Sequence, residues 1–136
     1  MLSELNVNDV QKKDEPFRRW FQNEFFDLMV WYSENKEISG FQLSYNKGSV
    51  NEKCLMWTKK EGFRHYSVDD PVFMGRKKAP LLVSDGIMPV KEILLKFKES
   101  SINMEEFLQK FILEKIQDFD IQQNKKRKDI LDSKKM

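Results

Sequence analysis

The chain contains a single histidine, His65, which lies a few residues before two aspartates in the segment HYSVDD. Carboxylates are the ligands that hard cations such as Mg²⁺ prefer in proteins. His65, Asp69 and Asp70, together with Asp85, are therefore the candidate residues for a metal-assisted enzyme. We favour the alternative, in which the two aspartates end a strand and stabilise a polar turn.

A second possible chemistry involves the only cysteine, Cys54. Structural zinc needs four N or S ligands and catalytic zinc about three, and the chain has no CxxC, HxH or HExxH motif. A two-residue turn after the strand that holds Cys54 would leave it ~13 Å from His65. A four-residue loop would bring the pair to ~7 Å. Because nothing orients His65 in either arrangement, we expect Cys54 to be a buried core residue.

The segments 24–33 (EFFDLMVWYS) and 38–46 (ISGFQLSYN) predict a hairpin, since both are rich in aromatic and branched residues and ENKE between them is typical of a turn. With a tip at Asn35 and Lys36, one face carries only apolar cross-strand pairs. These pairs are Phe26–Tyr45, Leu28–Leu43 and Val30–Phe41. The opposite face is mixed, with the pairs Asp27–Ser44, Met29–Gln42 and Trp31–Gly40.

This mixed face predicts a ligand-binding site in which Trp31 and Trp57 stack on a flat ligand while Asp27 and Gln42 hydrogen-bond its edge. With His65 added, the candidate site is Asp27, Trp31, Gln42, Trp57 and His65. The alternative is a solvated sheet face or a small network of satisfied polar groups. The strand register that decides which face Trp57 and His65 occupy stays open.

The remaining elements predict an α+β fold. Segments 52–58 and 63–68 continue an antiparallel β-meander of four to five strands, with 17–21 (FRRWF) as an edge strand. A helix follows Pro89, with its apolar stripe at positions 90, 93, 94 and 97, and a second helix begins at Asn103. We expect both helices to pack on one face of the sheet, because its apolar side must be covered.

The length of 136 residues predicts one α+β domain over 17–122, with a flexible N-terminal arm (1–16) and a basic C-terminal tail (123–136). The net charge is +2, and residues 125–136 carry six Lys/Arg and two Asp, which is +4 and leaves −2 for residues 1–124. A nearly neutral body does not favour nucleic acid as a partner. Nucleic-acid binding through the basic tail, with KKRK at 125–128, is a weaker alternative to a solvated helix end.

No apolar run approaches the ~20 residues of a membrane span, and the N-terminal segment lacks the apolar core of a signal peptide. We therefore expect a cytoplasmic protein without a membrane partner, either a monomer or a homodimer. Motifs of the GxSxG, GxGxxG and GxxxxGK[ST] types are missing, so no cofactor is predicted. The function that fits best is a non-catalytic module that binds a small ligand or a protein partner.

Several sequence blocks resemble those of a small family of uncharacterised bacterial proteins. They are RRWF (18–21), FFDLMVW (25–31), GFQLSY (40–45), LMW (55–57), GFRHYSVDD (62–70) and PLLVSDG (80–86). The resemblance extends over about residues 17 to 113. It implies no activity and assigns no catalytic residue.

Overall fold

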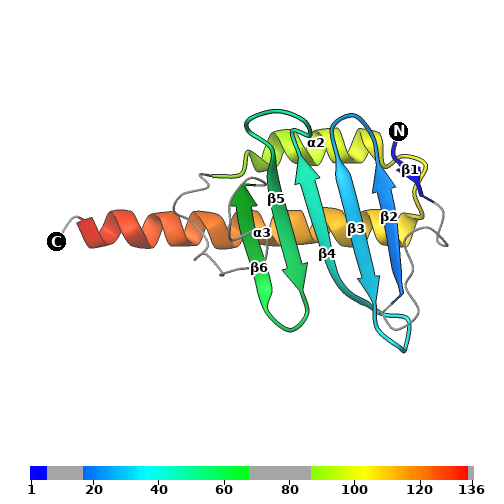
Figure 1. Cartoon of the computed structure of the whole chain (residues 1–136). Coiled ribbons are helices and arrows are strands. Elements are labelled where there is room, and N and C mark those ends of the chain that lie inside the picture. The colour runs from blue at the N-terminus through cyan, green and yellow to red at the C-terminus, as the bar shows by residue number, and fades with distance from the viewer. Residues whose placement is uncertain (6–16, 68–86, 135–136) are drawn as a thin grey trace. The chain divides into compact units, whose positions relative to one another are not determined.

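A computed structural model describes residues 1–5, 17–67 and 87–134, with side chains as far as Asp129. The chain forms two units, Met1–Asp85 and Gly86–Met136. Among the described residues, the first unit contains one antiparallel sheet of six strands and the second contains two helices (Figure 1). The predicted α+β class is thus confirmed. No helix in the described ranges is both long enough and apolar enough to cross a membrane.

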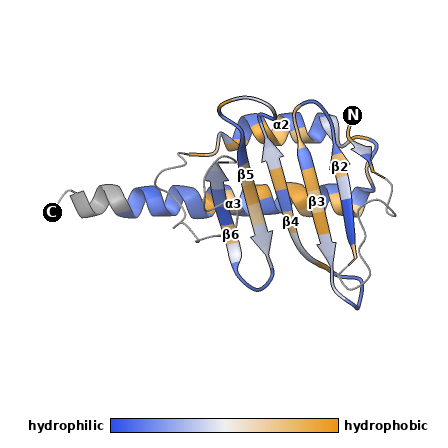
Figure 2. Ribbon diagram, viewed as in Figure 1, coloured by the Kyte–Doolittle hydropathy of each residue, from blue (hydrophilic) through white to orange (hydrophobic). Residues whose placement is uncertain are grey.

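The sheet is a meander in which each strand pairs with the next along the chain. Its strands are β1 (Ser3–Glu4), β2 (Arg18–Gln22), β3 (Asp27–Tyr32), β4 (Ile38–Tyr45), β5 (Lys53–Thr58) and β6 (Gly62–Ser67). Within the sheet, the hydrophobic colour of Figure 2 is strongest in β3, β4 and β5. The sheet has six strands, one more than the upper limit of the four to five that the sequence predicts.

The additional strand, β1, lies in the segment 1–16 that was predicted to be a flexible arm. Ser3 pairs with Gln22, and Glu4 accepts two hydrogen bonds from the Arg19 guanidinium, at 2.7 and 2.8 Å. Leu2 is also buried, with 2% of its surface exposed. The start of the chain is thus ordered by the sheet, and residues 6–16 lie outside the described ranges.

The register of β3 against β4 agrees with the prediction from Asp27–Ser44 to Trp31–Gly40. The tip differs from the predicted turn, because the register shifts after Trp31 and Tyr32 pairs with Ile38. Lys36 adopts a positive φ of 68°, and its N–H donates to the Ser33 carbonyl at 2.9 Å. The ladder was therefore predicted correctly, whereas the turn contains a bulge.

The register of β5 against β6 differs from both alternatives that the sequence offered. Leu55 pairs with His65, and Thr58 pairs with Gly62 across a loop formed by residues 59–61. Gly62 has a φ of 79°, a conformation that glycine adopts at little cost. This three-residue loop places His65 on the face opposite Cys54, whereas both predicted registers placed the two side chains on one face.

The helical unit consists of α2 (Val90–Ser100) and α3 (Glu106–Lys134). Both predicted helices are present, although α3 begins at Glu106 rather than at Asn103. A buried apolar stripe runs along α3 through Leu108, Ile112, Ile116 and Phe119. The helix then continues through most of the predicted tail, 123–136. The packing of the two helices on one face of the sheet stays a prediction.

Candidate functional site

The sheet separates the five residues of the predicted site between its two faces. Asp27, Trp31 and Gln42 alternate with the buried residues of β3 and β4, so they share the mixed face. Trp57 pairs with Phe41, and its ring stacks on that phenyl ring with centroids 6.2 Å apart. Three of the five residues are therefore brought together, while Trp57 and His65 project from the opposite, apolar face.

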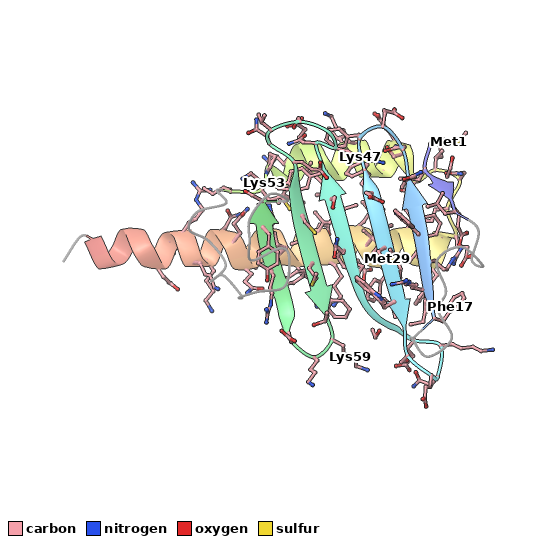
Figure 3. The ribbon with its side chains drawn as sticks, in the orientation of Figure 1. Met1, Phe17, Met29, Lys47, Lys53 and Lys59 are labelled. Atoms are coloured by element: carbon pink, nitrogen blue, oxygen red, sulfur yellow. The ribbon has the colours of Figure 1, made fainter. Side chains whose placement is uncertain are left out.

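The mixed face is organised in rows that cross the strands. The strand registers align Trp20, Met29, Gln42, Met56 and Arg64 in a line across β2 to β6, which we call the central row. Every member of the central row is half-buried. Met29 lies near the middle of this face in Figure 3. Trp31 and Asp27 flank Met29 along β3 and belong to the adjacent rows.

Trp20 is a part of the site that sequence reasoning missed. Its indole N–H donates a hydrogen bond to Oδ1 of Asp27, which joins β2 to β3 on the mixed face. The predicted edge strand at 17–21 already contained Trp20, but the register of that strand against β3 was not predicted. With the pairing of Trp20 to Met29 known, the tryptophan falls beside Asp27.

One side of the mixed face is buried more deeply than the central row. Ser44, Cys54 and Tyr66 lie in one row with exposed fractions of 6, 0 and 5%. Burial raises the pKa of the Cys54 thiol from 9.0 to about 12, despite a hydrogen bond with Ser44 that acts in the opposite direction. Cys54 and His65 project from opposite faces, so these two side chains do not form a nucleophile pair.

His65 belongs to the apolar face, where it forms a hydrogen bond with a tyrosine. Its Nε2 lies 2.7 Å from the hydroxyl of Tyr45, and the two rings stack at 9° with centroids 5.9 Å apart. His65 is 3% exposed and Tyr45 is fully buried. A buried polar pair of this kind satisfies both groups and fixes their orientation. His65 therefore acts as a core residue in this geometry.

The predicted cation ligands Asp69, Asp70 and Asp85 lie outside the described residues. Within the described ranges, no three His, Cys, Asp or Glu side chains are grouped closely enough to hold a metal ion. His65, the remaining member of the proposed metal group, has Nε2 engaged by Tyr45.

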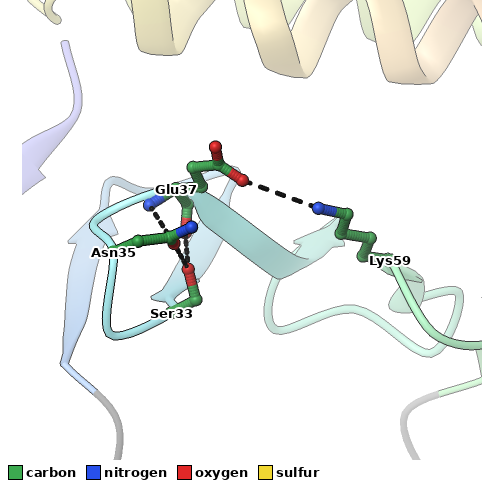
Figure 4. Close-up of polar contacts among 4 residues, drawn as sticks. All are labelled: Ser33, Asn35, Glu37 and Lys59. Carbon is green, nitrogen blue, oxygen red and sulfur yellow. Dashed lines mark hydrogen bonds and ion pairs between the residues drawn. The ribbon is translucent and has the colours of Figure 1, made fainter.

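A cleft of about 490 Å³ lies at the end of the sheet where the β3–β4 turn meets the loop after β5. It is lined by Ser33, Glu34, Asn35, Glu37, Ile38, Ser39 and Lys59. The Lys59 ammonium lies 3.5 Å from the Glu37 carboxylate, while the Ser33 hydroxyl donates to the Glu37 carbonyl (Figure 4). Because the Lys59 and Glu37 side chains are 72% and 63% exposed, their ion pair contributes little.

Comparison with known proteins assigns neither a family nor a function to the chain. No protein family, no curated protein and no solved structure matches the chain. The resemblance to a small bacterial family stays a prediction. The arguments about function therefore depend on the residues of the mixed face.

Proposed function

We propose that the protein is a non-catalytic binding module that docks a protein partner on the mixed face of its sheet. The observation that carries this proposal is the central row, which crosses five adjacent strands. With strands spaced ~4.8 Å apart, the row is roughly 19 Å long. That length exceeds a single flat ligand and is comparable to a contact patch between proteins.

The composition of the central row supports the same conclusion. Tryptophan, methionine and arginine are enriched in protein interfaces, and tryptophan and arginine dominate their energetics. Trp20, Met29, Met56 and Arg64 supply all three types in one line. Each of these side chains is half-buried, so a partner could remove a further part of it from water.

Two members of the central row are already held in place by polar contacts. Asp27 accepts a hydrogen bond from Trp20, and Glu61 forms an ion pair with Arg64 at the opposite end of the row. Side chains that are ordered before binding lose less conformational entropy when a partner docks. This preorganisation favours the central row as an anchor for a rigid partner surface.

The same geometry supports a protein partner over the small ligand that the sequence also allows. The predicted small-ligand site required Trp31 and Trp57 on one face, and the β5 register places Trp57 on the other. Asp27, Trp31 and Gln42 remain in the proposed site, now together with the central row. A protein partner uses this broad surface without needing the second tryptophan.

The proposal can be tested by placing a photo-crosslinking amino acid at Met29 in the full chain. We expect crosslinking to one defined protein in the cells that produce this chain. The control is the same amino acid at Val50, which is 95% exposed in the loop between β4 and β5. Irradiation of the purified protein alone tests whether the partner is a second copy of the chain.

The captured partner can then be titrated with variants of the mixed face. Truncation of an anchor in an interface typically costs about 2 kcal/mol, or roughly 30-fold in affinity. We expect Trp31→Ala to weaken binding by that factor and Val50→Ala to leave it unchanged. Equal crosslinking from positions 29 and 50, or equal affinity of both variants, would contradict the proposal.

A further inference from the structure

The last part of α3 extends beyond the point where α2 begins. Gln123 is buried, and its side-chain amide accepts from the Met88 N–H at 2.9 Å and donates to the Met88 carbonyl at 3.2 Å. Met88 lies two residues before the start of α2, so this double contact marks the level on α3 near which α2 starts (Figure 1). Residues 124–134 continue the helix past this level over roughly 16 Å.

This extension carries the KKRK sequence as a helix. Residues on an α-helix are separated by about 100° around the axis, so four consecutive residues point in four directions. Lys125, Lys126, Arg127 and Lys128 therefore form a ring of positive charge, which we call the basic ring. Lys126 is half-buried, the other three are exposed, and none of the four forms an ion pair within the described part of the chain.

The arrangement of charge around the helix points to one class of ligand. A helix that lies on an anionic membrane has its cations on one side and an apolar face on the other. The basic ring has cations on all sides, and neighbouring Asn124 and Asp129 are exposed polar residues. A helix in the major groove of a DNA duplex, in contrast, has phosphates on both sides of it.

We propose that the basic ring at the end of α3 binds double-stranded DNA through the phosphates on both walls of the major groove. A single α-helix of ~10–12 Å fits the ~12 Å width of that groove. Contacts with phosphates alone carry no base sequence information, so binding is independent of sequence. The proposal is separate from the protein-binding function of the mixed face and does not rest on it.

Binding of this kind depends strongly on salt, since each neutralised phosphate releases condensed counterions. The logarithm of the association constant falls by about 0.9 per contact for each tenfold increase in salt. If all members of the basic ring contact phosphates, the slope is about −3.6. The affinity is that of nonspecific binding, with a Kd on the order of 10⁻⁴ to 10⁻⁶ M at physiological salt.

The test is a fluorescence titration of a short DNA duplex with the full chain at increasing NaCl. The variant Lys125→Gln/Lys126→Gln/Arg127→Gln/Lys128→Gln removes the basic ring but keeps good helix formers, so circular dichroism should show the same helix content. We expect this variant to lose at least about tenfold in affinity at low salt and most of the salt slope.

A charge-matched pair of variants separates the basic ring from net charge. Lys125→Gln/Lys128→Gln and Lys59→Gln/Lys60→Gln remove the same charge, the second from the exposed loop between β5 and β6. We expect the first to lower the salt slope by about 1.8 and the second to leave the slope unchanged. An equal change in both variants would show that only net charge matters and would overturn the proposal.

Three other ligands test the groove geometry. Double-stranded RNA should bind more weakly than DNA, because its major groove is deep and narrow. Single-stranded DNA lacks the groove and should bind more weakly than the DNA duplex. Vesicles that contain phosphatidylserine present a flat anionic surface and should also bind more weakly than the duplex. Equal or tighter binding of any of these three, or no binding of the DNA duplex at low salt, would contradict the proposal.

Discussion

The two faces of the sheet come from the same strands but differ in what their side chains do. In β3, Leu28 and Val30 are fully buried, whereas Met29 and Trp31, which alternate with them, remain half-buried. The apolar face therefore contributes to stability, and the mixed face keeps large anchors accessible to water. This difference agrees with the proposal that a partner docks on the face that contributes less to folding.

The largest predicted difference between the two faces concerns adjacent residues of β4. Leu43 is fully buried on the apolar face, and Leu43→Ala should lower the free energy of unfolding by about 3 kcal/mol. Gln42 projects from the mixed face, and Gln42→Ala should change the free energy of unfolding by about 0.5 kcal/mol or less. Urea denaturation measures both values, and similar losses would show that both faces contribute equally.

A smaller effect is expected for the polar pair within the apolar face. Tyr45→Phe removes the hydroxyl that lies 2.7 Å from His65 Nε2 and leaves a buried ring nitrogen without that partner. The cost should be about 2 kcal/mol in urea denaturation. Tyr32→Phe, at a half-buried position at the end of β3, is the control and should have little effect. A neutral Tyr45→Phe would show that the pair does not stabilise the core.

The buried row of the mixed face predicts a dependence of stability on alkaline pH. Because the pKa of Cys54 is about 12 in the folded state and 9.0 without burial, the folded state retains the proton that the unfolded state loses. Stability is therefore fully present below pH 9 and falls as the pH rises towards 12, by up to about 1.4 kcal/mol per pH unit.

The measurement is urea unfolding between pH 8 and pH 11, which brackets the onset at the unperturbed pKa of 9.0. Cys54→Ala removes the thiol. The free energy of unfolding of this variant should therefore fall less steeply with rising pH than that of the natural chain, whatever the effect of the substitution on stability at neutral pH. Identical slopes for the two proteins would show that the thiol is accessible and that this row is less buried than the structure indicates.

The smallest effect is expected at the rim of the sheet. Lys59→Gln breaks the ion pair with Glu37 at the cleft beside the β3–β4 turn. Because both side chains are exposed, the thermal midpoint should barely change, corresponding to less than about 0.5 kcal/mol. The measurement is a thermal unfolding curve in low salt, where a large shift would show that this cleft contributes more to stability than its exposure implies.

Local patterns predicted the β3–β4 ladder, because an apolar run on each side of a turn composition leaves few registers that keep the apolar face intact. They did not predict the β5–β6 register, since the loop after Thr58 depends on a positive φ at Gly62. This loop decides which face His65 occupies, whereas the register of β5 against β4 decides the face of Trp57. Only Asp27, Trp31 and Gln42 of the predicted site therefore share one face.

Two other features depend on contacts between distant parts of the chain. β1 is too short to show an alternating pattern, and it is held by the pair between Arg19 and Glu4. The role of Trp20 follows only from the pairing of β2 with β3, which places its indole beside Asp27. In contrast, the continuation of α3 beyond Gln123 agrees with the helix propensity of lysine and arginine.

The most direct test of the central claim compares Met29→Arg with Leu28→Arg in urea denaturation. If the mixed face is a surface for a partner, Met29→Arg should keep the free energy of unfolding within about 1 kcal/mol of the natural chain. Leu28→Arg should prevent stable folding, because it places a charge at a fully buried position. A loss of about 3 kcal/mol or more for Met29→Arg would contradict the account, since Met29 would then belong to a second core.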